Sequence, residues 1–347
     1  MNKPKKLNPG DRVAAVTLSW GGPGAYPLRY QAGVQQLEAE FGLEVVPMPH
    51  TLRDPDWLGR NPEARAHDLM TAFNDPTIAG IISTIGGDDS IRLLPFLDLD
   101  IIRSNPKVFM GYSDTTISHF ICFQSGLVSF YGPSIMAGFA ENGGLFAYLI
   151  KSVRRTIFST APIGEISPNM DGWTVEYLDW SNADNQTRPR ILQESPGWKF
   201  LQGNGVARGH LIGGCFEVMD WLRGSEYWPT LEQWDGAILF LETSEEAPPP
   251  LQVKYGLRAL ASLGVLKRIS GFIFGRPGGQ LPPENFHEYD QAILQVVRDE
   301  EGLTTLPVVT HMDFGHTDPM FVLPYGVEAK IDCDQKEFSI LESAVED

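Results

Sequence analysis

Short apolar runs alternate with amphipathic stretches in the N-terminal part of the sequence, and this alternation limits the fold more than any other feature. The apolar runs are near-continuous and do not alternate with polar residues, as in strands that are buried on both faces of a parallel sheet. The amphipathic stretches have the periodicity of helices that cover such a sheet. We therefore expect an α/β domain with a parallel sheet. The predicted strands are residues 12–19, 43–48, 78–85 and 108–110, and the predicted helices are residues 26–41, residues 62–74, one from about residue 90 and one ending at residue 124.

The sequence changes character in its middle, where turn-forming residues and three tryptophans replace the regular alternation. We interpret residues 157–200 as a linker and tryptophan-rich insertion that separates two domains, residues 1–156 and 201–347. Apolar strands and helices return after the insertion, so the second domain is also expected to contain a sheet. Its predicted strands are residues 237–241, 269–274, a run near 308 and 327–331, and its predicted helices are residues 251–263 and 289–300.

The size and charge of the chain exclude some classes of protein. Its 347 residues suit two domains of roughly 100–200 residues each. A formal net charge of −17 repels polyanions, so we expect neither a nucleic acid polymer nor a membrane as a partner. The three cysteines lie far apart, which argues against a disulfide framework or a structural zinc site. No window is long and apolar enough for a membrane span or a signal peptide, so a soluble, cytoplasmic protein is predicted.

Gly111-Tyr112-Ser113-Asp114-Thr115 stands where a predicted strand turns into a predicted helix. The commoner outcome for such a position is a helix cap, in which the side chain of Ser113 or Asp114 accepts a backbone N–H. The alternative is a nucleophile elbow, in which the serine Oγ projects from a tight turn. The N–H of Asp114 would then face a developing oxyanion. The pattern G-x-S-x-T matches the G-x-S-x-G of α/β-hydrolases only in part.

A paired-glycine turn, Gly86-Gly87, follows the preceding predicted strand. Turns after parallel strands meet at one edge of the sheet, so this turn and Ser113 are expected to lie close together. Its backbone N–H groups are candidates for the second oxyanion donor, although an ordinary strand-end turn explains the glycines equally well. The glycines after the first strand, residues 21–24, lack the spacing of a dinucleotide-binding loop, which argues against a Rossmann cofactor site.

A serine nucleophile requires a base and a group that orients the base. His316 stands among Gly, Asp and Pro residues, so its side chain is expected to project from a loop, either as a base or as part of a polar turn. Asp313 and Asp318 flank it, but their spacing matches no familiar metal motif. Glu242 ends an apolar strand, where a carboxylate can be partly buried beside an imidazole.

Other ionisable residues are assigned lesser roles. Glu245 and Glu246 are interpreted as solvated loop charges, and His119 as a residue that packs or faces solvent. His210 lies in Gly209-His210-Leu211-Ile212-Gly213-Gly214, directly before Cys215. A Gly-Gly-Cys turn is suggestive of a thiol nucleophile, but no partner motif surrounds it.

Six motifs occur in a fixed order along the chain: R-x-x-D-L-x-x-A-F-x-D-P-x-I at residues 65–78, I-x-T-I-G-G, G-Y-S-D-T-T, G-H-L-I-G-G, L-F-L-E-T-S-E-E and D-x-G-H-T-D-P. This ordered set resembles the LD-carboxypeptidase family of serine peptidases. Within that family it is most similar to the microcin C self-immunity (MccF-like) subgroup. The resemblance covers nearly the whole chain.

The resemblance implies a flavodoxin-like N-terminal domain, a β-rich C-terminal α/β domain, a homodimer, and neither a cofactor nor a metal. It implies a Ser-Glu-His triad with Ser113 as nucleophile, Glu242 as acid and His316 as base. The oxyanion donors implied are the N–H groups of Asp114 and Gly86, with Gly87 as the neighbouring option.

Two activities compete within this family. Its LD-carboxypeptidases remove the terminal D-alanine of murein tetrapeptide, whereas MccF-like enzymes cleave the carboxamide between a peptidyl or aminoacyl group and a modified nucleotide. The forms of the serine and glutamate motifs favour the second activity. The tryptophan-rich insertion does so too, with Trp180 as the expected base-stacking residue, although plain packing explains any one tryptophan as well. Cys215 stands where the family usually has asparagine, which bears on substrate contacts.

Functions of other classes remain open on the sequence alone. A non-catalytic protein that binds a small ligand between two lobes would carry the same turns but no reactive serine. A nucleotide-dependent oxidoreductase is disfavoured because the glycine fingerprint is missing.

Overall fold

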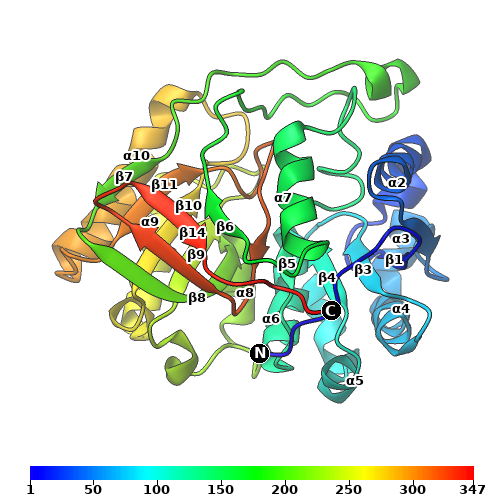
Figure 1. The fold of residues 1–347 in the computed structure, drawn as a ribbon, viewed down its shortest axis with the longest axis horizontal. Helices are drawn as coiled ribbons and strands as arrows, with labels where there is room; N and C mark the ends of the chain where they lie inside the picture. Colours follow the sequence, from blue (N-terminus) through cyan, green and yellow to red (C-terminus); the bar gives the residue numbers. More distant parts are fainter.

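The computed structural model describes residues 1–347 and contains two sheets that lie side by side (Figure 1). The first sheet has the strand order β12-β5-β4-β3-β1-β2. Its first five strands in sequence run parallel, in the flavodoxin-like order 2-1-3-4-5. The strands are β1 (Arg12–Val16), β2 (Glu44–Pro47), β3 (Gly80–Ser83), β4 (Val108–Gly111), β5 (Phe130–Tyr131) and β12 (Leu323–Pro324).

Helices cover both faces of the first sheet, as the apolar strands predict. Val13 and Ala15 belong to one hydrophobic cluster, whereas Ala14 and Val16, which alternate with them, belong to a second cluster on the opposite face. The helices of this half are α1 (Gly22–Ala25), α2 (Pro27–Phe41), α3 (Pro55–Arg60), α4 (Pro62–Asn74), α5 (Leu99–Ser104), α6 (Thr116–Gln124), α7 (Ala147–Ile157) and the 3₁₀ turns η1 (Ser90–Phe96) and η2 (Ser113–Thr115).

The second sheet has eight strands in the order β6-β14-β13-β8-β9-β10-β11-β7. Its central four strands are parallel and its flanking strands are antiparallel. These strands are β6 (Gly164–Ile166), β7 (Lys199–Gln202), β8 (Val206–Cys215), β9 (Ile238–Glu242), β10 (Gly271–Gly275), β11 (Val308–Met312), β13 (Glu328–Asp332) and β14 (Glu337–Ile340).

The helices of the second half are mostly short. Three of them are α-helices, and the remainder are single 3₁₀ turns and one π-helical segment. They are α8 (Phe216–Leu222), α9 (Pro250–Ser262), α10 (Phe286–Leu294), η4 (Leu231–Trp234), η5 (Val265–Lys267), η6 (Pro283–Asn285) and the π-helix η7 (Gln295–Glu300). None of the helices in the structure combines the length and the apolar character needed to cross a lipid bilayer.

One hydrophobic core runs through both sheets. The larger cluster contains 68 buried residues and includes β4 and α6 of the first half together with β8, β9 and β11 of the second. Tyr131 of β5 contacts Phe240 of β9, with ring centroids 5.5 Å apart. The two halves are therefore packed directly against each other where β5 meets β9.

Several elements differ from the sequence-based expectations. The predicted helix from residue 90 is the 3₁₀ turn η1, which contains Pro95. The helix predicted at 289–300 begins at Phe286 and continues as a π-helix from Gln295. The long strand β8 was not predicted, because only its second half is buried and apolar.

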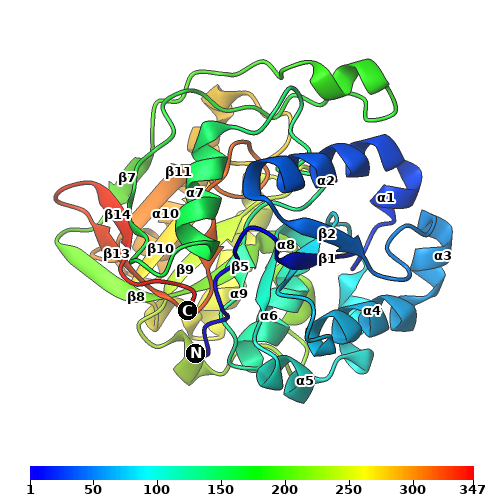
Figure 2. The same cartoon turned by 45° about the vertical axis from the view of Figure 1, so that its right-hand side comes forward.

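Residues 157–200, the insertion, are mostly irregular and contain only β6 and the 3₁₀ turn η3 (Ala183–Thr187) before β7 begins at its end. The insertion passes over the top of both halves in Figures 1 and 2, and η3 lies against α2. Two strands cross the predicted domain boundaries, since β6 pairs with β14 and β12 pairs with β5. The domain limits at residues 156 and 200 stay predictions.

Candidate active site

Ser113 occupies a strained turn between β4 and α6. Its φ is 61°, in the left-handed region that residues other than glycine rarely adopt. The Oγ atom lies 3.0 Å from Nε2 of His316 and caps no helix. The turn therefore has the geometry of a nucleophile elbow, and the helix-cap interpretation of Ser113 is wrong.

His316 and Glu242 complete a chain of hydrogen bonds that starts at Ser113. Nδ1 of His316 lies 2.7 Å from Oε2 of Glu242, which is fully buried at the end of β9. The close approach requires Gly315, because a Cβ at this position, with its φ of 93°, would meet the Glu242 carboxylate. Such a chain can pass the Ser113 proton to His316 while Glu242 fixes the imidazole tautomer.

Two glutamates act on the charge of His316. Burial by itself lowers the pKa of this imidazole, but the charge of Glu242 and hydrogen bonds with Glu242 and Glu245 raise the pKa well above its usual value. Oε2 of Glu245 lies 3.1 Å from Nε2, the same nitrogen that faces Ser113. The hydrogen bond to His316 lowers the pKa of Glu245 to about 2. Glu245 is therefore more than a solvated loop charge, although its side chain is 71% exposed.

Tyr131 connects the serine turn to the buried acid and was not singled out in the sequence. Its hydroxyl accepts the backbone N–H of Ser113 at 3.1 Å and donates to Oε1 of Glu242. The residue lies on β5, beside β4, at the contact between the two sheets. The only sequence signal was a tyrosine in an apolar run, which is also typical of ordinary core packing.

The paired-glycine turn lies against Ser113. A Cβ built on Gly86 would be 2.8 Å from Oγ of Ser113 and 3.4 Å from the backbone nitrogen of Asp114, so only glycine leaves room there. The N–H groups of Gly86 and Gly87 donate no hydrogen bond to another group of the protein. They are therefore free to face a ligand that sits over Ser113.

The side chain of Asp114 fixes this turn in place. Its Oδ2 accepts the backbone N–H groups of Asp89 and Ser90, at 3.0 and 2.8 Å, and its Oδ1 accepts the Ser90 hydroxyl. Asp114 thus caps η1 of the neighbouring turn and not its own helix. The glycine turn and the serine turn are joined through this buried carboxylate.

Cys215 lies beside the site on β8, directly across from Glu242 on β9. Cys215, Glu242 and His316 each have a potential metal-ligand atom within 4.8 Å of the others. Burial and the nearby carboxylates raise the pKa of the Cys215 thiol, which disfavours the thiolate needed to bind a metal or attack a substrate.

The other histidines and the flanking aspartates have structural partners. His119 is buried between Ser129 and the Gly111 carbonyl, and His210 bonds the Gln233 carbonyl. Asp313 pairs with Arg276 and Asp318 pairs with Arg190. The aspartates on either side of His316 thus form ion pairs with arginines.

Trp180 is half-buried and packs against residues of the first half. The guanidinium of Arg29 sits 4.9 Å from the centre of its ring, and Tyr26 contacts it edge-on at 5.8 Å. Trp173, by contrast, is buried, and Trp198 donates its indole N–H to Asp313. Trp180 is the one of these three whose indole N–H has no protein partner.

Comparison with known families identifies the chain. Residues 13–132 match the LD-carboxypeptidase N-terminal domain, and residues 208–331 match the LD-carboxypeptidase C-terminal domain. The microcin C7 self-immunity protein MccF of Escherichia coli is 32% identical over 322 residues, which cover 90% of this chain and 88% of that protein. The chain belongs to the LD-carboxypeptidase family. It is accordingly a hydrolase of the serine carboxypeptidase type.

Solved structures of MccF proteins share the fold of this LD-carboxypeptidase family member. The MccF-like protein from Streptococcus pneumoniae, in complex with AMP, superposes with a TM-score of 0.85 at 33% identity and covers 95% of this chain and 98% of its own. MccF in complex with aspartyl sulfamoyl adenosine gives a TM-score of 0.83 at 29% identity and full coverage of both chains. The expected two-domain α/β architecture is confirmed.

Proposed function

We propose that this family member hydrolyses the carboxamide between an aminoacyl or peptidyl group and a modified nucleotide, with Ser113 as nucleophile, His316 as base and Glu242 as orienting acid. The observation that carries the proposal is the continuous hydrogen-bond chain from Oγ of Ser113 through His316 to Glu242. The strained φ of Ser113 and the free N–H groups of the glycine turn support it.

The proposed reaction uses each group in turn. His316 takes the Ser113 proton as Oγ attacks the amide carbonyl, and Glu242 stabilises the imidazolium. The N–H groups of Asp114 and Gly86, with Gly87 beside them, hold the oxyanion, where the loss of one such donor typically costs about 2.7–4 kcal/mol. His316 then protonates the departing nitrogen. Water, activated by the same imidazole, hydrolyses the acyl-enzyme.

The nucleotide part of the proposal rests on the relatives and on Trp180. Solved MccF structures hold AMP or aspartyl sulfamoyl adenosine. Stacking of a base on an aromatic ring contributes about 1–3 kcal/mol, and we propose that Trp180 supplies this contact here. Cys215 is buried beside Glu217, and its thiol cannot make the hydrogen bonds of the usual asparagine amide.

A comparison of substrates tests the proposal. The intact enzyme should hydrolyse aspartyl sulfamoyl adenosine, and Ser113→Ala should abolish the reaction while it leaves the circular dichroism spectrum unchanged. Turnover by Ser113→Ala at the parent rate would exclude the assigned nucleophile. Cleavage of murein tetrapeptide and not of the nucleotide conjugate would instead favour the release of terminal D-alanine.

Homodimer formation and a cytoplasmic location are also proposed, from the family resemblance alone. Light scattering coupled to size exclusion should give twice the monomer mass of 38.5 kDa. A monomer at micromolar concentration would contradict the dimer.

A further inference from the structure

His316 stands in an irregular loop between β11 and β12, and the aspartates on either side of it are both held by the insertion. Asp313 comes first and is completely buried. Its Oδ2 accepts the backbone N–H of Asn169 at 3.0 Å and the indole N–H of Trp198 at 2.7 Å. Its Oδ1 accepts a hydrogen bond from Nη2 of Arg276 at 2.7 Å, so both carboxylate oxygens have a partner.

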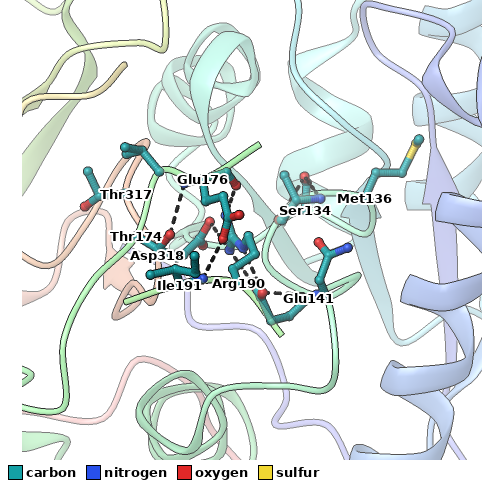
Figure 3. Close-up of polar contacts among 12 residues, drawn as sticks. Ser134, Met136, Glu141, Thr174, Glu176, Arg190, Ile191, Thr317 and Asp318 are labelled. Carbon is teal, nitrogen blue, oxygen red and sulfur yellow. Dashed lines mark hydrogen bonds and ion pairs between the residues drawn. The ribbon is translucent and has the colours of Figure 1, made fainter. Parts of the chain in front are cut away.

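Asp318 follows His316 and is held in two ways. Its backbone N–H and C=O pair with those of Thr174, at 3.0 and 2.8 Å, as in a short antiparallel bridge. Its Oδ2 accepts Nη2 of Arg190 at 2.8 Å. Thr174 and Arg190 both belong to the insertion, and Figure 3 shows them next to Asp318.

Arg190 also reaches the first half of the molecule. Its Nε donates to Oε1 of Glu141 at 2.8 Å, and Nη2 contacts the other oxygen of the same carboxylate. The Glu141 and Arg190 side chains are 1% and 9% exposed. Figure 3 shows the guanidinium between Glu141 and Asp318. A planar guanidinium suits this role because it can bind two carboxylates at fixed angles.

These contacts matter because the loop has no regular structure of its own. Gly315 allows a left-handed turn directly before His316, and Glu242 and Glu245 contact only the imidazole ring. A displacement of about 1 Å in a catalytic group can reduce a rate about 100-fold. The contacts of Asp313 and Asp318 with the insertion hold the backbone on either side of His316.

We propose that the insertion positions the base, with Arg190 and Trp198 as positioning residues that act on His316 through Asp318 and Asp313. This inference rests on the proposed role of His316. It assigns the insertion a function in the chemical step itself, separate from any contact with the nucleotide. Neither residue touches Ser113, so both act through the loop.

Two variants and a control test the inference. Arg190→Gln removes the charge that joins Glu141 to Asp318, and Trp198→Phe removes one N–H but keeps a ring against Phe321. Glu176→Gln is the control, because the Glu176 carboxylate binds Arg188 and the N–H of Ile191 within the insertion and does not contact the His316 loop.

The measurements are kcat and KM with aspartyl sulfamoyl adenosine, and the rate at which a fluorophosphonate labels Ser113. Both variants should lower kcat about 10- to 100-fold, change KM less than about twofold, and slow labelling by the same factor as kcat. Arg190→Lys should have a kcat between those of Arg190→Gln and the parent, because lysine keeps the positive charge but lacks the planar guanidinium that binds two carboxylates. Glu176→Gln should have the kcat, KM and labelling rate of the parent enzyme.

The outcome that overturns the inference is a folded Trp198→Phe variant with the parent kcat and the parent labelling rate. A purely structural role would lower the melting temperature alone and leave both rates per folded molecule unchanged. The labelling rate does not depend on the substrate, so it tests the positioning role even when the conjugate is not hydrolysed. Absence of labelling at Ser113 in the parent enzyme would instead refute the proposed function.

Discussion

At the scale of single residues, Tyr131 shows how one side chain can join parts of a site that lie far apart in sequence. It is 111 residues away from Glu242, yet its hydroxyl stands between that carboxylate and the backbone of Ser113. A hydroxyl can donate one hydrogen bond and accept others, so it suits both neighbours. Tyr131 thus fixes the acid and the strained turn relative to each other.

Replacement of Tyr131 by phenylalanine should reduce kcat about tenfold or more. The buried Glu242 would lose a donor, and an unsatisfied buried group costs about 1–3 kcal/mol. Steady-state kinetics and thermal unfolding measure the two effects. Tyr325→Phe is the matched control, because the Tyr325 hydroxyl binds the Gly213 carbonyl and not the site. Equal activities of the two variants would contradict the role assigned to Tyr131.

The raised pKa of His316 predicts a pH dependence. A general base must be neutral, so kcat/KM should rise with pH through the pKa of His316 in the free enzyme, which lies above the usual value of about 6.5. Glu245→Gln removes one contribution that raises this pKa, so the acid limb should move to lower pH. The kcat/KM profile from about pH 5 to about pH 10 measures both. A shift to higher pH in the variant would exclude this role of Glu245.

At the scale of elements, the site depends on two turns at the carboxyl edge of the first sheet. The serine turn ends β4 and the glycine turn ends β3, and parallel pairing of these strands places them side by side. Asp114 then joins them through the N–H groups of Asp89 and Ser90. The sequence identified both turns, but the role of the Asp114 carboxylate depends on their contact.

Asp114→Ala should therefore affect stability and activity together. The N–H of Ser90 would lose its acceptor, whereas the N–H of Asp89 would keep its hydrogen bond to Oγ of Ser19. The free energy of unfolding should therefore fall by about 1–3 kcal/mol. The glycine turn would also be less well fixed, so kcat should fall about tenfold. Chemical denaturation and kinetics measure these effects. Asp88→Ala, at an exposed position of the same turn, should change neither, and a similar loss in both variants would contradict this account.

Gly86→Ala tests the space above Ser113. The added methyl group would lie 2.8 Å from Oγ, so it should block the position of a substrate carbonyl and abolish detectable hydrolysis. The φ of Gly86 lies outside the left-handed region, but the methyl group would also lie 2.8 Å from Cβ of Ser113, so the melting temperature should fall as well. Kinetics and a melting curve test this expectation. Retention of most of the parent activity would show that the carbonyl binds elsewhere.

At the scale of the whole molecule, the two halves share one core, and the C-terminal half supplies a strand to the first sheet. β12 comes from the C-terminal half and completes the first sheet, whereas the larger hydrophobic cluster runs through both sheets. This arrangement explains why Glu242 and His316 already lie beside Ser113 without any closing movement of the halves.

The shared core predicts a single unfolding transition. Calorimetry should show one peak whose calorimetric and van't Hoff enthalpies agree, as in a single cooperative unit. Residues 1–156 expressed alone lack β12 and should not unfold cooperatively. Two separated transitions in the intact chain, or a stably folded fragment, would show that the halves are independent.

The sequence determined the features that depend on local pattern and residue chemistry. Continuous apolar runs indicated the buried parallel strands, and their ends indicated Gly86, Ser113 and Glu242. His316 was found because its loop contains residues that leave regular structure. β8 was missed because its partly exposed first half hides its periodicity, and the cap interpretation of Ser113 failed because residue type alone does not reveal a distant partner.

Only the tertiary structure decided how these residues are held. The supporting groups come from segments that are separate in the chain. Tyr131 donates to Glu242, the Asp114 carboxylate accepts the N–H groups of Asp89 and Ser90, and Asn169 donates to Asp313. Hydrogen bonds between such segments leave no periodic signal, because the spacing that creates them is set by sheet order and packing. The reactive groups could therefore be identified in the sequence, whereas their support was fixed by the fold.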